Sequence, residues 1–82
     1  MKCYVYKSPK KVDTYLYLNR KDGFDVLPHG LRALFGRPEF VLEFELVQGS
    51  TLARADAGQV MSELNEQGYY LQMPPQVGTP GT

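Results

Sequence analysis

Two alternating segments separated by a short polar loop constrain the fold of this chain most strongly. Residues 2–7 read Lys-Cys-Tyr-Val-Tyr-Lys, and residues 14–19 read Thr-Tyr-Leu-Tyr-Leu-Asn. Alternation of this kind places successive side chains on opposite faces of a strand, and aromatic and β-branched residues favour strands. Pro9 and the lysines of the intervening loop suit a turn exposed to water. The sequence therefore predicts a β-hairpin over residues 2–20.

Two helices are expected after the hairpin. Pro28 suits the first position of a helix and Gly36 suits its left-handed end, which together predict a two-turn helix over residues 28–35. Asp56 has the carboxylate that an N-cap requires, and Gly68 marks the end of the helix that follows it. The first helix has only two turns, so we expect packing rather than intrinsic propensity to hold it in place.

Three further strands complete the predicted elements. Residues 39–47 alternate clearly, and one face of this strand is expected to be buried through Phe40, Leu42, Phe44 and Leu46. Shorter strands are expected over residues 51–54 and 69–73. An order of strand, strand, helix, strand, strand, helix, strand is typical of an α+β domain. We expect a mixed or mainly antiparallel sheet of four to five strands with both helices on one face.

The chain length and composition favour one small domain. The 82 residues are 43% hydrophobic, which is ordinary for a globular protein. We assign residues 1–75 to the domain and expect residues 76–82, rich in Gly, Pro and Thr, to form a disordered tail. Cys3 is the only cysteine, and the N-terminus has no apolar segment typical of a signal peptide. These features predict a cytoplasmic protein with no membrane-spanning segment.

Several short motifs resemble those of the YcgL domain family, a group of small bacterial proteins. They include Ser8-Pro9-Lys10, Thr14-Tyr15-Leu16-Tyr17, Lys21-Asp22, Phe35-Gly36 and Glu66-Gln67-Gly68-Tyr69-Tyr70-Leu71-Gln72, with Cys3, Tyr6, Phe24 and Pro74-Pro75 beside them. The resemblance extends over residues 1–75 and keeps the order and spacing of the family. It implies a compact α/β domain and implies no catalytic residues.

Charge is divided unevenly along a chain whose net charge is zero. Residues 1–24 contain six basic and two acidic side chains, whereas residues 25–82 contain three basic and seven acidic ones. One interpretation is that the two parts attract each other within the folded domain. The other is that the basic part binds an anionic partner.

The hairpin also contains the candidate binding surface. If Val5 and the leucines of the return strand face the core, the opposite face of the sheet gathers Tyr4, Tyr6, Tyr15 and Tyr17. Five basic side chains would border this face: Lys7, Lys10, Lys11, Arg20 and Lys21. Cross-strand packing alone explains such tyrosines. A protein interface, or a weak single-stranded RNA site with bases stacked on the rings, are the functional alternatives.

No arrangement of residues in the sequence predicts catalysis. His29 has no second histidine or cysteine at the spacing of metal ligands. Glu43 and Glu45 share a strand face simply because strands alternate, and Cys3 is expected to be a small buried apolar residue. Phosphate-binding glycine motifs are absent from the sequence. We therefore expect a domain that is not an enzyme and that needs no metal or cofactor, with an unidentified protein as its partner or, alternatively, single-stranded RNA.

Overall fold

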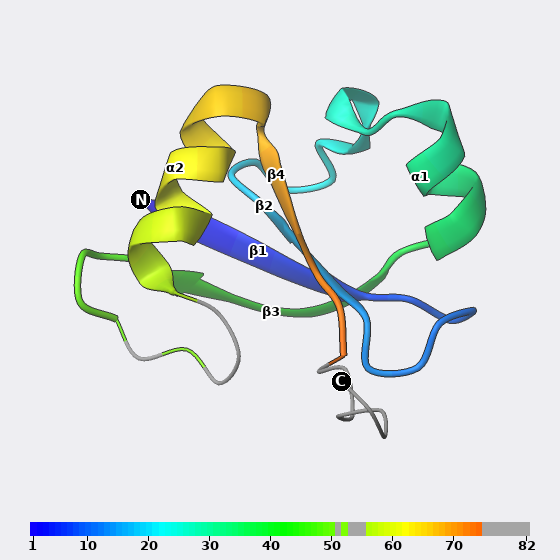
Figure 1. Cartoon of the computed structure of the whole chain (residues 1–82), viewed down its shortest axis with the longest axis horizontal. Helices are drawn as coiled ribbons and strands as arrows, with labels where there is room; N and C mark the ends of the chain where they lie inside the picture. Colours follow the sequence, from blue (N-terminus) through cyan, green and yellow to red (C-terminus); the bar gives the residue numbers. More distant parts are fainter. Residues whose placement is uncertain (51, 53–55, 75–82) are drawn as a thin grey trace, which may run out of the picture.

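The computed structural model describes residues 1–50, 52 and 56–74. In this part of the chain the elements follow one another in an order that Figure 1 shows by colour. They are β1 (Lys2–Lys7), β2 (Tyr15–Leu18), the 3-10 turn η1 (Phe24–Val26), α1 (His29–Phe35), β3 (Glu39–Glu45), α2 (Ala57–Gln67) and β4 (Tyr69–Gln72). The predicted hairpin is confirmed, and its first strand has the predicted bounds.

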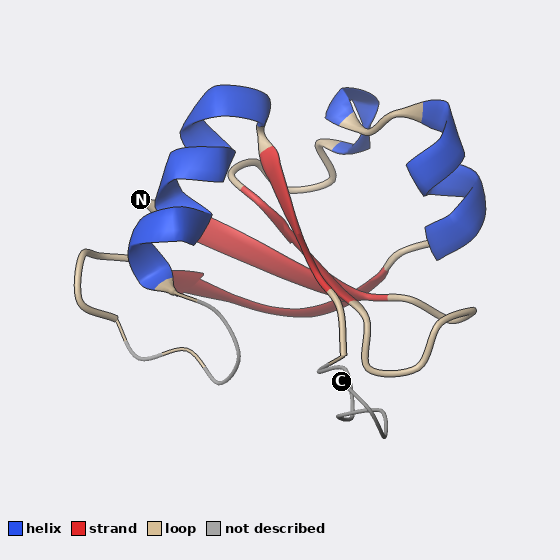
Figure 2. Ribbon diagram, in the orientation of Figure 1, coloured by secondary structure: helices blue, strands red, loops and turns tan. Residues whose placement is uncertain are grey.

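The four strands form a single antiparallel sheet in the order β3-β1-β2-β4 (Figure 2). The predicted α+β class and the strand number are therefore confirmed. The hairpin supplies the two central strands, and β3 and β4 form the edges of the sheet. The strand predicted over residues 51–54 falls almost entirely outside the described residues, as does the predicted tail over residues 76–82.

The two helices pack on opposite faces of this sheet, so the prediction that both lie on one face is wrong (Figure 1). On one face Cys3 and Val5 pack with Val60 of α2. On the other face Tyr6 packs with Phe35 of α1. The reason is that both alternating sets of side chains in the hairpin are apolar or aromatic, so each face of the central strands has to be covered by a helix.

The predicted helix ends are largely confirmed. Asp56 is the N-cap of α2 and its Oδ2 accepts a hydrogen bond of 2.9 Å from the backbone N–H of Gln59. Gly68 ends this helix at a φ of 88°, a left-handed conformation that glycine adopts without strain. Gly36 ends α1 at a φ of 83°. Pro28 is the N-cap of α1 rather than its first helical residue, a shift of one position from the prediction.

The strand β3 is far less buried than its alternating sequence predicts. Leu46, just after the strand, is fully buried, but Phe40 is 49% exposed and Leu42 is 45% exposed. Phe40 pairs with Tyr6 and Leu42 pairs with Val5, with a shift of register between the two pairs. This bulge places Phe40 and Leu42 on opposite faces of an edge strand. The prediction of a single buried face on β3 is therefore wrong.

Candidate functional site

The four hairpin tyrosines do not form one surface. Tyr4 pairs with Leu18 and Val5 pairs with Tyr17 across the hairpin, so tyrosines of the two strands lie on opposite faces of the sheet. Tyr4 and Tyr6 lie on the face covered by α1, whereas Tyr15 and Tyr17 lie on the face covered by α2. The predicted face of four tyrosines is wrong because of the hairpin register, which the sequence leaves open. The register sets Tyr4, Tyr6 and Tyr17 opposite aliphatic residues and Tyr15 opposite Lys7.

Two of these tyrosines are core residues with paired hydroxyl groups. Tyr6 is 1% exposed and Tyr17 is 8% exposed. The hydroxyl of Tyr6 donates to Oδ1 of Asp22 at 3.1 Å, and that of Tyr17 donates to Oε1 of Gln72 at 2.9 Å. Burial raises the pKa of both tyrosines. Neither ring presents a free stacking surface, while Tyr4 and Tyr15 remain half-buried.

The basic side chains of the hairpin mostly contact other parts of the domain. Lys7 Nζ lies 3.9 Å from Oε1 of Glu39, and Arg20 pairs with Asp25 at 3.2 Å. Lys10 donates a hydrogen bond of 3.2 Å to the carbonyl oxygen of Ala33 in the last turn of α1. This contact places a positive charge at the negative end of the helix. Lys11 is exposed and borders a small crevice between the loop, α1 and the end of β4.

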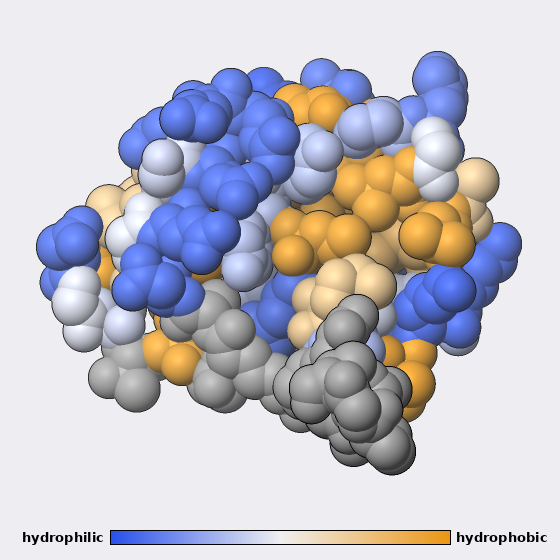
Figure 3. Space-filling view, viewed as in Figure 1, coloured by the Kyte–Doolittle hydropathy of each residue, from blue (hydrophilic) through white to orange (hydrophobic). Residues whose placement is uncertain are grey.

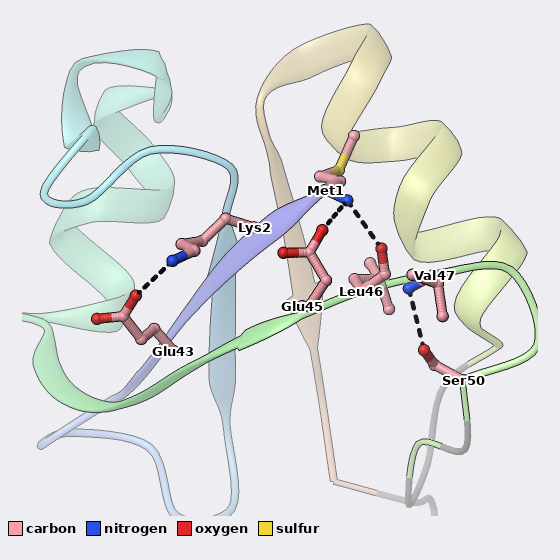
Figure 4. Close-up of polar contacts among 7 residues, drawn as sticks. All are labelled: Met1, Lys2, Glu43, Glu45, Leu46, Val47 and Ser50. Carbon is pink, nitrogen blue, oxygen red and sulfur yellow. Dashed lines mark hydrogen bonds and ion pairs between the residues drawn. The ribbon is translucent and has the colours of Figure 1, made fainter.

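Charge pairing extends along the contact between β1 and β3. Lys2 Nζ lies 3.4 Å from Oε2 of Glu43, and the amino group of Met1 lies 2.6 Å from Oε2 of Glu45 and 3.0 Å from the carbonyl oxygen of Leu46 (Figure 4). The hydrogen bond from the amino group lowers the pKa of Glu45. All four ion pairs of the described residues join the basic first part of the chain to acids of the second part. This pairing supports attraction between the two parts within the folded domain, although Lys10, Lys11 and Lys21 take part in none of these ion pairs.

The most exposed apolar strand segment lies on β3. Phe40, Val41 and Leu42, here called the β3 edge patch, are 49%, 41% and 45% exposed. Because β3 pairs only with β1, its outer edge has no strand partner in the described part of the chain. The Phe40 ring packs edge-on against Tyr6, with centroids 5.6 Å apart, and Lys21 Nζ lies 5.6 Å from the Phe40 centroid. Lys7, through Glu39, and Lys21 therefore border this patch.

The β3 edge patch was missed in the sequence because alternation predicts which residues share a face but not which strand lies at an edge. The run Phe-Val-Leu was a usable signal, since three consecutive apolar residues cannot all face one core from a strand. A second apolar surface lies between α1 and β4 (Figure 3). Leu34 and Met73 are its most exposed residues.

The residues considered for catalysis are not brought together. His29 is exposed at the start of α1, and Glu43 and Glu45 are exposed on β3. Cys3 is fully buried, as predicted, and burial raises the pKa of its thiol to about 12. A thiol with so high a pKa is almost entirely protonated and is a poor nucleophile.

The described ranges also contain no group of three or more His, Cys, Asp or Glu side chains placed to share a metal ion. Among the helices in the same ranges, none has the length and apolar character needed to cross a bilayer. The candidate functional feature of the described residues is the β3 edge patch, a surface bordered by charged side chains.

Residues 3–75 of the chain match the family model of the YcgL domain. A YcgL domain-containing protein of Thioalkalivibrio sulfidiphilus is 57% identical over 76 residues, which cover 93% of this chain and 94% of that protein. A YcgL domain-containing protein of Yersinia pseudotuberculosis is 48% identical over 75 residues, covering 92% and 83%. One of Shewanella oneidensis is 47% identical over 75 residues, covering 92% and 82%. The chain therefore belongs to the YcgL domain family.

Proposed function

We propose that this YcgL domain is a non-enzymatic interaction domain that binds a protein partner along the outer edge of β3. The observation that carries the proposal is the β3 edge patch, in which three consecutive apolar side chains are exposed on a strand with one unpaired edge. An edge of this kind accepts an extended segment as an additional strand, with affinity from main-chain hydrogen bonds and specificity from side-chain contacts. A cytoplasmic location is part of the proposal, because the single free thiol suits a reducing compartment.

The proposed partner surface therefore differs from the tyrosine face predicted from the sequence, although it keeps two of the predicted lysines. Lys7 at the end of β1 and Lys21 in the turn after the hairpin border the β3 edge patch, while two of the four tyrosines, Tyr6 and Tyr17, lie within the core. An extended segment with apolar side chains and an acid placed near Phe40 fits this arrangement. The apolar side chains cover the patch, and the acid approaches Lys21, which takes part in none of the ion pairs of the described residues.

Single-stranded RNA remains the alternative prediction. It has less support than a protein partner, because stacking requires exposed rings and both Tyr6 and Tyr17 are buried. The two proposals differ in their response to salt. RNA binding through lysines weakens steeply as the salt concentration rises, whereas an apolar strand contact changes little.

The proposal is tested by site-specific photo-crosslinking in cells, with a photoreactive phenylalanine analogue at position 41 or, as the matched control, at position 12. Val12 is an apolar residue that is 81% exposed in the hairpin loop, outside β3. We expect a discrete crosslinked protein from position 41 only. Leu42→Lys should remove this product without changing the fold, whereas Val12→Lys should leave it unchanged. Equal products from both positions, or none, would contradict the proposal.

A further inference from the structure

A groove on the α1 side of the domain is separate from the β3 edge. It has a volume of about 400 Å³ and is lined by Phe24, Leu27, Arg32, Gly36, Arg37 and Pro38. This volume lies within the range of about 300–1,000 Å³ that small-molecule sites occupy. The lining of the groove therefore combines apolar residues with two arginines.

The apolar part of the groove is held in place by contacts behind it. The Phe24 ring packs edge-on against Tyr6 with centroids 4.9 Å apart, and Leu27 is buried. The end of α1 is held by the hairpin loop, through Lys10 to the carbonyl oxygen of Ala33 and Ser8 Oγ to that of Phe35. The groove is thus built on supported elements, so little ordering is required before a ligand binds.

The two arginines are available to a ligand. None of the ion pairs in the described part of the chain involves Arg32 or Arg37, although all nine acidic residues of the sequence are described. Two acids are adjacent in sequence to lining residues: Asp25 is paired with Arg20, and Glu39 is paired with Lys7. Most basic groups of residues 1–24, by contrast, have a partner within the domain. Within residues 1–50, 52 and 56–74, therefore, no acidic side chain forms an ion pair with the two arginines of the groove.

We propose that this groove binds a small organic anion, with an apolar body about the size of one aromatic ring and one carboxylate or phosphate group. The ring would lie against Phe24, Leu27 and Pro38, while the anionic group would accept hydrogen bonds from Arg32 and Arg37. Guanidinium groups suit this role because their planar N–H groups match the oxygens of carboxylates and phosphates.

The test is an NMR titration of the ¹⁵N-labelled domain with four probes: phenyl phosphate, benzoate, phenol and inorganic phosphate. Phenol has the ring without the anion, and inorganic phosphate has the anion without the ring. We expect saturable shifts of the Leu27, Gly36 and Arg37 amides with phenyl phosphate or benzoate, at millimolar affinity, and weaker binding of the other two. Tighter binding of phenyl phosphate would indicate a phosphate site, and tighter binding of benzoate would indicate a carboxylate site.

The variants Arg32→Gln and Arg37→Gln should each weaken binding of the stronger probe about tenfold, the usual effect of losing a hydrogen bond to a charged group. Lys2→Gln is the matched control, since it removes one positive charge at a different place and should leave affinity within about twofold. Amide spectra of each variant establish that the fold is retained. The proposal would be overturned if no saturable shifts occur at the groove. It would also be overturned if both arginine variants bind the probe as tightly as the parent, or if inorganic phosphate binds as tightly as phenyl phosphate.

Discussion

The hydroxyl group of Tyr6 makes two hydrogen bonds with Asp22, donating to its Oδ1 at 3.1 Å and accepting from its backbone N–H at 2.8 Å. Asp22 has a φ of 56°, an uncommon conformation for a residue other than glycine. The buried tyrosine of β1 thus fixes the turn that leads from the hairpin into η1. The same turn positions Lys21, whose Nζ lies over the Phe40 ring.

Replacement of Tyr6 by Phe should therefore destabilise the domain by about 1–2 kcal/mol, because the Asp22 N–H and carboxylate both lose a partner while the ring packing remains. Urea unfolding measures the change. Tyr4→Phe is the control, since Tyr4 is half-buried on the same strand face and its hydroxyl has no hydrogen bond with the described residues. Equal stability changes in the two variants would show that the hydroxyl pair with Asp22 contributes nothing specific.

The hydrogen bond between Tyr17 and Gln72 joins β2 to β4 within the buried part of the α2 face. Tyr17→Phe leaves Oε1 of Gln72 unpaired and should lower stability by about 1–3 kcal/mol. The double variant Tyr17→Phe/Gln72→Leu lacks both the hydroxyl and the amide group. It should therefore recover part of the stability lost in Tyr17→Phe. A double-mutant cycle measures the coupling. Strict additivity of the two single changes would contradict the assigned pairing.

Two glycines, one at the end of α2 and one in the first turn of α1, should respond to alanine in opposite directions. Gly68 has a φ of 88°, and a Cβ there would lie 3.2 Å from Cγ1 of Val26. Gly68→Ala should therefore cost about 1 kcal/mol or more. Gly30 lies inside α1 with no atom within 4 Å of the added Cβ, so Gly30→Ala should stabilise by up to about 1 kcal/mol. Thermal unfolding of the two variants beside the parent checks both signs, and the same sign for both would be inconsistent with the helix ends described.

Alkaline pH should destabilise the domain through Cys3. Burial raises the pKa of this thiol from 9.0 to about 12, so the folded state holds the proton more tightly than the unfolded state. The stabilisation is complete below pH 9.0 and is lost progressively as the pH rises toward 12. The raised pKa values of Tyr6 and Tyr17 act in the same direction.

We expect the urea midpoint to fall as the pH rises above 9.0. We also expect Cys3 to react with a thiol reagent at neutral pH only on unfolding, with the urea-unfolded chain as the positive control. Rapid reaction of the folded protein would show that the thiol is accessible and would refute the assigned burial. A midpoint that stays constant up to pH 12 would contradict the direction of the pKa shift.

The sequence by itself determined the local elements. Alternation predicted the hairpin strands, Asp56 and Gly68 predicted the bounds of α2, and the motifs around residues 66–72 indicated the YcgL family. These features depend on short-range chemistry, such as capping, left-handed glycine conformations and the two-residue period of strands. They can therefore be predicted without knowledge of which strands and helices contact one another.

Only the tertiary structure decided which faces are buried. The hairpin register placed Tyr4 opposite Leu18, so the tyrosines were divided between two faces and two helices. The position of β3 at an edge, with a bulge beside Val5, exposed Phe40 and Leu42. Likewise, the sequence does not show which basic side chains form ion pairs. The structure shows that Arg32 and Arg37 take part in none of those among the described residues. Pairing partners and strand order are non-local, and an alternating pattern is compatible with several of them.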